Sequence, residues 1–136
     1  RFRRQEQEAV ERAVEWLHFF DLFGEANRRA GELPYGHQRR LEIARALCTD
    51  PQLLCLDEPA AGLNPNETRA LSQLIQALRE KEGVTVLLIE HDMGLVMDIS
   101  DHLVVLDHGE VIAQGRPEAI QQDERVLAAY LGTGTP

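Results

Sequence analysis

The sequence predicts an α/β fold with a mainly parallel sheet, and two observations lead to this prediction. First, residues 53–56 and 84–89 are short, uninterrupted apolar runs, which are typical of strands buried on both faces. Second, segments with the apolar periodicity of helices precede, separate and follow these runs. Because strands that alternate with helices form parallel sheets, we expect an α/β domain or part of one.

The first part of the chain is expected to hold two helices joined by a polar, turn-rich stretch at residues 24–36. The helix over residues 5–21 is indicated by apolar side chains at helical spacing, namely Val10, Ala13, Val14, Leu17 and Phe20. The next helix is expected over residues 37–48, and its apolar stripe is Leu41, Ala44 and Leu47. The pair Asp50-Pro51 is expected to stop it.

The strand at residues 53–56 is followed by a helix with clear end signals. Asn64 is expected to be its N-cap, Pro65 suits its first turn, and Glu67 completes the spacing of a capping box. Gly83 is expected to end the helix. The residues expected to face the core are Leu71, Leu74, Ile75 and Leu78.

The last third of the chain is expected to be a short helix, a hairpin, a further helix and a closing segment. The short helix, which follows the strand at 84–89, carries Leu95, Val96 and Ile99. Residues 103–106 and 111–113 are expected to pair as a hairpin around residues 107–110. Pro117 is expected to open the next helix, and residues 126–131 form the last element.

Composition and charge limit the classes of function. At 136 residues the chain is one domain or part of one, and a hydrophobic content of 43% can supply a core. The net charge of −9 argues against a nucleic-acid partner, whose binding surface would be basic. The arginines grouped within residues 1–4 and 39–45 are interpreted as solvated faces. No signal peptide is recognised, and no apolar stretch reaches the roughly 18 residues that span a bilayer.

The two cysteines, Cys48 and Cys55, lie in apolar patterns and have neither the number nor the spacing of a disulfide framework or a zinc site. They are interpreted as buried reduced thiols, which fits the cytosol. The chain starts at Arg1 without an initiator methionine, and we expect it to be a piece of a longer polypeptide.

Acidic side chains follow the first predicted strand directly. Asp57 and Glu58 come at its end, and Pro59 prevents the ladder from continuing. Ligands of open α/β sheets bind at the carboxyl ends of the strands, so one acid can hold a metal while its neighbour faces a water or a substrate. The plainer alternative is that the two acids only cap the next turn.

Two further segments have the chemistry of an anion site. His91 follows the second predicted strand and can donate a hydrogen bond to a phosphate or orient a water, although it can equally be an ordinary loop histidine. Gly36 lies at the start of a helix, where unpaired backbone N–H groups and the helix dipole favour an anion. The plainer alternative for Gly36 is a simple turn before a surface helix.

Taken in order, these segments resemble the ATP-binding cassette (ABC) ATPases over almost the whole chain, residues 5–131. Residues 33–37 are similar to the signature loop of this family, residues 53–58 to its Walker B strand, residues 60–65 to its D-loop and His91 to its switch histidine. Three sequence segments most closely resemble the ATP-binding subunits of bacterial branched-chain amino-acid importers, namely LPYG…RRLEIARAL, DEPAAGLNP and LLIEHDM.

The resemblance implies a role for each matched residue. Asp57 would help to hold Mg²⁺ through water, Glu58 would polarise the water that attacks the γ-phosphate of ATP, and His91 would contact and sense that phosphate. The signature residues Pro34, Tyr35, Gly36 and His37, with Asn64 of the D-loop, would belong to the nucleotide site. The signature residues would cover the ATP of a second subunit, in a homo- or heterodimer.

The resemblance also implies a domain plan and partners. Residues 1–50 would be the helical subdomain with the signature loop, and residues 51–136 the C-terminal part of the RecA-like core of a P-loop NTPase fold. Residues 5–32 would transmit motion to a membrane permease, and a periplasmic solute-binding protein would be an indirect partner. The subunit would lie on the cytoplasmic face of the bacterial inner membrane. The assignment to amino acids rests on the similarity of these sequence segments alone. No residue of this chain is expected to touch the solute.

The chain departs from the family pattern at three places. Pro34 replaces the usual serine of the signature, and Asn64 replaces the frequent aspartate of the D-loop, as is common in importers of the amino-acid type. More importantly, neither a GxxxxGK[ST] phosphate loop nor the glutamine loop occurs in the 136 residues. The phosphate loop supplies the backbone cradle and the lysine for the nucleotide, so we expect this chain alone to bind ATP poorly and not to hydrolyse it.

The missing segment also bears on the sheet. In related P-loop folds the strand before the phosphate loop lies between the strand that ends at His91 and the next strand. We therefore expect residues 84–89 to expose an unpaired edge, the hairpin after Leu103 to lack its sheet neighbour, and about 100 further residues to precede Arg1.

Three alternatives to an importer ATPase remain open on the sequence. The chain could belong to an ABC ATPase of another transporter, such as one for lipid or lipopolysaccharide. It could belong to a non-transport ABC protein of translation or DNA repair, which the acidic charge and the lack of a coiled coil disfavour. It could also be an interaction fragment that does not hydrolyse ATP.

Overall fold

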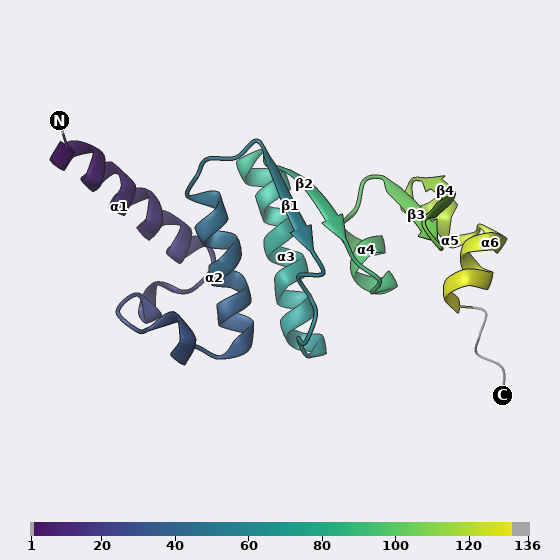
Figure 1. The fold of residues 1–136 in the computed structure, drawn as a ribbon, viewed down its shortest axis with the longest axis horizontal. Coiled ribbons are helices and arrows are strands. Elements are labelled where there is room, and N and C mark those ends of the chain that lie inside the picture. The colour runs from purple at the N-terminus through teal and green to yellow at the C-terminus, as the bar shows by residue number, and fades with distance from the viewer. Residues whose placement is uncertain (1, 132–136) are drawn as a thin grey trace. The chain divides into compact units, whose positions relative to one another are not determined.

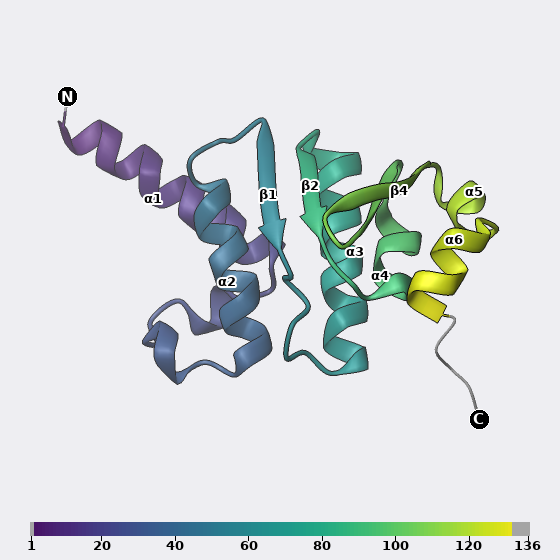
Figure 2. The ribbon, with the colours of Figure 1, turned by 45° about the vertical axis from the view of Figure 1, so that its right-hand side comes forward.

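The computed structural model describes residues 2–131, and the chain divides into two compact units, residues 1–91 and 92–136. Figures 1 and 2 show the elements of both units, and each unit is described by itself below. The α/β class is as predicted, with helices and strands alternating through the first unit. The resemblance implied a boundary between subdomains near residue 50, which differs from this division by contacts and stays a prediction.

The first unit contains a parallel pair of strands with helices before and between them (Figure 1). Its elements in order are α1 (Phe2–Phe19), the 3₁₀ turns η1 (Phe23–Glu25) and η2 (Ala30–Glu32), α2 (Tyr35–Leu47), β1 (Leu53–Asp57), α3 (Pro65–Glu82) and β2 (Thr85–Ile89). Strands β1 and β2 are in register from Leu53 opposite Thr85 to Asp57 opposite Ile89. The carboxyl ends of both strands therefore lie at the same edge.

The β1–β2 sheet is buried on one face and open on the other. Leu54 and Leu56 are buried, whereas Leu53, Leu87 and Ile89 each expose more than half of their surface. The prediction that both strands are buried on both faces is therefore wrong. A continuous apolar run shows what a strand can bury, but burial needs a covering element on each side, and the elements described here cover one side.

Helix α3 has both of the ends that the sequence predicts. The Asn64 side chain accepts from the Glu67 N–H, and the Glu67 carboxylate accepts from the Asn64 N–H, so the capping box is complete. Gly83 caps the other end in the left-handed conformation. The core-facing side of α3 includes Leu71, Ile75 and Leu78, all buried.

Helix α1 begins earlier than expected and contributes less to the core. It contains no buried residue, and Val10, predicted to lie on its apolar face, is 57% exposed. Burial starts only past its C-terminal end, where Phe20 and Leu22 are fully enclosed. Trp16 packs beside Phe20 there, with 6.4 Å between the ring centres.

The predicted thiol environments are also wrong, because Cys48 is only partly buried and Cys55 is exposed on the open face of β1. Both cysteines are free of disulfide bonds. Among the described residues, no helix combines the length and the apolar character needed to cross a membrane.

The second unit is built around the predicted hairpin. Its elements are α4 (Met93–Ile99), β3 (Leu103–Asp107), β4 (Glu110–Gly115), α5 (Pro117–Gln121), α6 (Glu124–Val126) and a π-helical turn, η3 (Leu127–Leu131). Strands β3 and β4 are antiparallel, with an irregularity between Val105 and Leu106. The small core consists of Ala113, Ile120 and Val126. Asp123 caps α6, and the hydrogen bond from the Arg125 N–H lowers the pKa of that carboxyl.

The predicted gap in the sheet is confirmed within residues 2–131. Strand β2 pairs only with β1, and the β3–β4 hairpin forms a separate two-stranded sheet. The second edge of β2 therefore has no strand partner in the described part of the chain.

Candidate functional site

The candidate site lies at the carboxyl ends of β1 and β2. The ladder continues one step past β1, because the Glu58 N–H donates to the Ile89 carbonyl at 2.8 Å. The backbone then turns sharply at Glu58, whose φ of +46° is left-handed and uncommon for a residue with a side chain. Pro59 follows and is buried. A strained residue at a strand end is often part of a functional site.

The structure brings Glu58 and His91 together, as the sequence predicted. Glu58 Oε1 lies 3.4 Å from His91 Nδ1, although the two residues come from different strand ends. The two side chains are 51% and 71% exposed, so both remain accessible to a ligand. A carboxylate and an imidazole this close can both reach one water or one phosphate oxygen placed between them.

Asp57 is the last residue of β1 and is exposed beside this pair. Within residues 2–131 no group of three histidine, cysteine, aspartate or glutamate side chains is arranged to hold a metal ion. Asp57 is thus a carboxylate that could contribute one metal ligand, with other ligands coming from elsewhere.

Glu90, to which the sequence pattern assigned no role, contacts both strand ends. Its Oε1 accepts from the Ala60 N–H at 2.9 Å, and its Oε2 accepts from the His91 N–H at 3.2 Å. The only sequence signal for this arrangement is an acid directly before the histidine. The sequence does not indicate what Glu90 binds, because both donors are backbone N–H groups, which every residue except proline has.

The segment at residues 33–37 forms the start of α2, two residues earlier than expected. Pro34 is the N-cap, and its carbonyl accepts from the N–H groups of His37 and Gln38 at 2.9 and 3.0 Å. The N–H groups of Tyr35 and Gly36, in the first turn, therefore have no acceptor within the helix. This is the geometry expected of an anion-binding helix start.

Tyr35 connects this helix start to the loop after β1. Its hydroxyl donates to the Ala61 carbonyl at 3.1 Å and accepts from Arg39 Nε at 2.9 Å. The Arg39 guanidinium also lies over the Tyr35 ring, 5.1 Å from its centre. Asn64, farther along the same loop, uses its side-chain oxygen to cap α3. The sequence pattern contained no signal for the contact between Tyr35 and Ala61.

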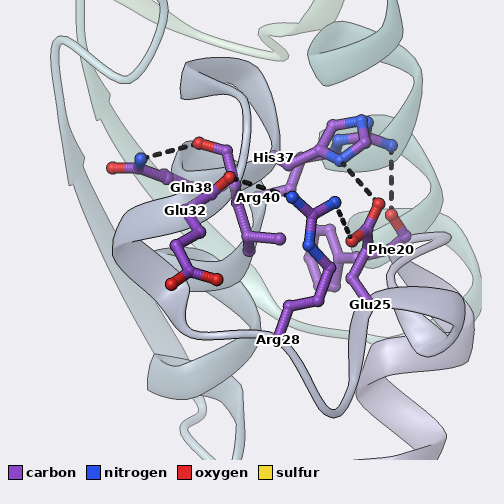
Figure 3. Close-up of polar contacts among 8 residues, drawn as sticks. Phe20, Glu25, Arg28, Glu32, His37, Gln38 and Arg40 are labelled. Atoms are coloured by element: carbon purple, nitrogen blue, oxygen red, sulfur yellow. Dashed lines mark hydrogen bonds and ion pairs between the residues drawn. The ribbon is translucent and has the colours of Figure 1, made fainter.

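The polar stretch before α2 is fixed by side-chain contacts rather than loose (Figure 3). Glu25 forms an ion pair with Arg28 at 2.8 Å, and its other oxygen lies 4.0 Å from His37 Nδ1. Arg40 donates to the Phe20 carbonyl at 3.1 Å. His37 Nδ1 is buried without a hydrogen-bond partner, and the Glu25 carboxylate lies 4.0 Å from it. These contacts hold the first turns of α2 against residues 20–32.

The parallel strand ends, the Glu58–His91 pair and the glycine-containing start of α2 are the segments on which the sequence resembles the ABC ATPases. Residues 1–61 match the family model described as ABC transporter, and residues 110–135 match the one described as branched-chain amino acid ATP-binding cassette transporter. Over these residues the sequence is similar to the ABC transporter ATP-binding family.

Within this family the chain is similar to ATP-binding proteins of branched-chain amino acid transport. It is 59% identical to the high-affinity branched-chain amino acid transport ATP-binding protein BraF of Pseudomonas aeruginosa, over 96% of this chain and 51% of that protein. It is 54% identical to the corresponding protein LivG of Escherichia coli, with the same shares covered. The chain thus spans about half the length of these curated relatives.

The fold agrees with that of solved ATP-binding cassettes. The crystal structure of the ADP conformation of MJ1267, an ATP-binding cassette of an ABC transporter, superposes with a TM-score of 0.83 at 36% identity. The match covers 92% of this chain and 50% of that one. The described residues are therefore a portion of the ABC ATPase fold.

Proposed function

We propose that this chain is the catalytic, C-terminal part of the ATP-binding subunit of an ABC importer for branched-chain amino acids. The observation that supports the ATPase activity is the approach of Glu58 to His91 at 3.4 Å, at the shared edge of two parallel strands. The solute class is supported by the names of the relatives that are 54–59% identical to this chain.

In this proposal each residue at the strand ends acts on the γ-phosphate or on the attacking water. Glu58 polarises the water, and His91 donates a hydrogen bond to the phosphate and responds to its presence. The turn at Glu58 aims its carboxylate away from the ladder and toward His91, which is consistent with these roles. Asn64 lies near the nucleotide and also caps α3.

Mg²⁺ fits the donor chemistry of this edge. Three acids, Asp57, Glu58 and Glu90, follow the ends of the two strands. Their carboxylates would repel a triphosphate unless a cation lay between the carboxylates and the phosphates. Asp57, exposed at the strand end, would hold the ion through water, in keeping with the preference of Mg²⁺ for few carboxylates and several waters. When bound, the ion neutralises charge on the phosphates.

The start of α2 is proposed to close over the nucleotide of a second ATPase subunit. Pro34 has no hydroxyl or N–H to offer, so the N–H groups of Tyr35 and Gly36 would contact the phosphate, with His37 beside them. Residues 5–32 would contact a membrane permease at the cytoplasmic face of the inner membrane. A periplasmic solute-binding protein would deliver the amino acid to that permease.

The decisive experiment compares the complete polypeptide that contains this chain, assembled with its permease, with its Glu58→Gln variant. We expect the variant to bind Mg-ATP and to lose hydrolysis and leucine uptake by about 100-fold or more, because it lacks the base that polarises the water. Glu110→Gln, an exposed acid of the hairpin, is the matched control and should be unchanged. Full hydrolysis by Glu58→Gln would contradict the proposal.

The chain by itself is proposed to be inactive, because it contains no phosphate loop. Purified residues 1–136 should show no ATPase activity above that of their own Glu58→Gln variant. Activity in the fragment that disappears in Glu58→Gln would overturn this part of the proposal.

A further inference from the structure

We infer that Glu90 is a positioning residue that clamps the segment after β1 to the end of β2 and thereby sets the distance between Glu58 and His91. This inference rests on the function proposed above, in which those two residues act on the same phosphate. Neither the sequence motifs nor the comparisons assign a role to Glu90.

The clamp consists of two hydrogen bonds from different strand ends. Ala60 lies in the loop after β1, and Glu90 Oε1 accepts from its N–H at 2.9 Å. Glu90 Oε2 accepts from the His91 N–H at 3.2 Å, directly after β2. One partly buried carboxylate therefore joins the two backbones that carry Glu58 and His91. Hydrogen bonds to an ionised acceptor are stronger than neutral ones.

The position of Ala60 explains why this bond matters for Glu58. On its N-terminal side Glu58 is held by its own N–H, which donates to the Ile89 carbonyl at 2.8 Å. On its C-terminal side Pro59 has no N–H, so Ala60 provides the first backbone donor after Glu58. Glu90 accepts from that donor, so the backbone on each side of Glu58 has a bond to the end of β2. The Glu58 carbonyl itself accepts from the Ala61 N–H at 3.1 Å, a bond within the turn that does not reach β2.

The backbone at Glu58 needs such support. Its φ of +46° is left-handed, a conformation that persists only where the surroundings enforce it. Without the bond from Ala60 the segment could relax toward a more common conformation, and the Glu58 carboxylate would move from its place 3.4 Å from His91. Both Glu90 oxygens accept backbone hydrogen bonds and the side chain is partly buried, so in this inference Glu90 acts through these neighbours.

The test uses the complete polypeptide with its permease and compares wild type, Glu90→Ala, Glu90→Gln and the exposed control Glu110→Ala. Glu90→Ala should lower kcat for ATP hydrolysis by about tenfold or more with KM for ATP changed less than twofold, because misplacing a reacting group by about 1 Å costs up to 100-fold. Glu90→Gln keeps an oxygen acceptor for Ala60 and should recover most of kcat. Glu110→Ala should match wild type.

A second readout does not depend on activity. Amide hydrogen exchange at Ala60 should be about tenfold faster in Glu90→Ala than in wild type, and close to wild type in Glu90→Gln. If Glu90→Gln is as slow in hydrolysis as Glu90→Ala, the negative charge matters rather than the clamp, and the inference is wrong. Unchanged exchange at Ala60 in Glu90→Ala also overturns it.

The two proposals fail in different ways. If wild type and Glu58→Gln hydrolyse ATP equally, the proposed function fails, whereas the exchange at Ala60 still decides whether the clamp exists. If Glu58→Gln is inactive and Glu90→Ala keeps full kcat, the proposed function stands and the role of Glu90 is refuted.

Discussion

Strands β1 and β3 are similar in sequence, but the side chains that gather at their carboxyl ends differ. They read LLCLD and LVVLD, and each ends in an aspartate, Asp57 or Asp107. Each is followed by a residue with left-handed backbone, Glu58 at φ +46° or His108 at φ +48°. Each end also carries an acid–histidine contact, at 3.4 Å between Glu58 and His91 and at 2.9 Å between Asp107 and His108.

The partner strand makes the difference between these two ends. Strand β3 returns at once as β4, and the positive φ values of His108 and Gly109 are those required of a two-residue hairpin turn. The backbone strain and the acid–histidine contact at this end are therefore explained by the turn alone. Strand β1 pairs in parallel with β2, which can be reached only through a long crossover. Its end thus collects side chains that are distant in the sequence, and no hairpin turn to a neighbouring strand accounts for the positive φ of Glu58.

The largest effect that tests this comparison is expected for the two strand-end aspartates. In the complete polypeptide, Asp57→Asn should lower Mg-dependent ATP hydrolysis by about 1000-fold if Asp57 has its proposed role, because a carboxylate that helps to hold a metal is worth several kcal/mol. Asp107→Asn should leave hydrolysis unchanged. Steady-state ATPase rates over a range of Mg²⁺ concentrations measure both, and equal losses in the two variants would show that the strand ends are not functionally different.

The histidines provide the next contrast. In the proposed function His91 donates to the phosphate, so His91→Ala should lower hydrolysis by about 100-fold, the cost of removing one hydrogen-bond donor from a developing charge. His108→Ala removes a side chain that is 94% exposed at the turn and should have no effect on the rate. Single-turnover hydrolysis with bound ATP separates the chemical step from binding. A normal rate for His91→Ala would remove the histidine from the mechanism.

The strand-end site could be predicted from the sequence because its geometry follows from simple rules. Apolar runs locate β1 and β2, and parallel strands place Glu58 and His91 at one edge without any further information. The capping box at Asn64 and Glu67 could be predicted for the same reason, since a helix start has a fixed spacing.

The features that could not be predicted are contacts between distant segments, which leave no periodic pattern in the sequence. The bonds from Ala60 to Glu90 and from Tyr35 to Ala61 join a side chain to a backbone group of another loop, and no residue spacing encodes such a pair. The burial of β1 was overestimated because apolar residues indicate a capacity for burial and not the element that covers them. The exposed Cys55 on the open face of β1 follows from the same cause.

Two glycines with nearly the same φ angle test packing in the two regions. Gly62 has φ +78° and Gly109 has φ +79°, but a Cβ on Gly62 would lie 2.9 Å from Tyr35 Cε1, whereas one on Gly109 would meet nothing within 4 Å. Gly109→Ala should cost about 1 kcal/mol from the backbone alone, and Gly62→Ala about 2–3 kcal/mol because the ring must also move.

The measurement for this pair is the free energy of local opening by amide hydrogen exchange, in α2 and α3 for Gly62→Ala and in β3 and β4 for Gly109→Ala. The control is Gly62→Ala in a Tyr35→Ser background, where the ring is gone and the cost should fall to that of Gly109→Ala. A cost that stays the same in this background would mean that the Tyr35 ring does not restrict the loop.

The smallest contrast concerns two tyrosine hydroxyls that hold strand-end backbones. Tyr35 donates to the Ala61 carbonyl at 3.1 Å, and Tyr130 donates to the Leu106 carbonyl at 2.6 Å. The side chains are similarly exposed, so each Tyr→Phe change should cost about 1 kcal/mol or less of local stability.

The consequences for hydrolysis should nevertheless differ between the two tyrosines. Tyr35→Phe loosens the loop that follows Glu58, and we expect a few-fold lower kcat, whereas Tyr130→Phe should leave kcat unchanged. Hydrolysis and hydrogen exchange measured on the same samples relate the two effects. Because the lost bonds are alike, an equal loss of kcat in both variants would mean that general stability limits the rate. A loss confined to Tyr35→Phe would instead tie it to the positions of the groups at the ends of β1 and β2.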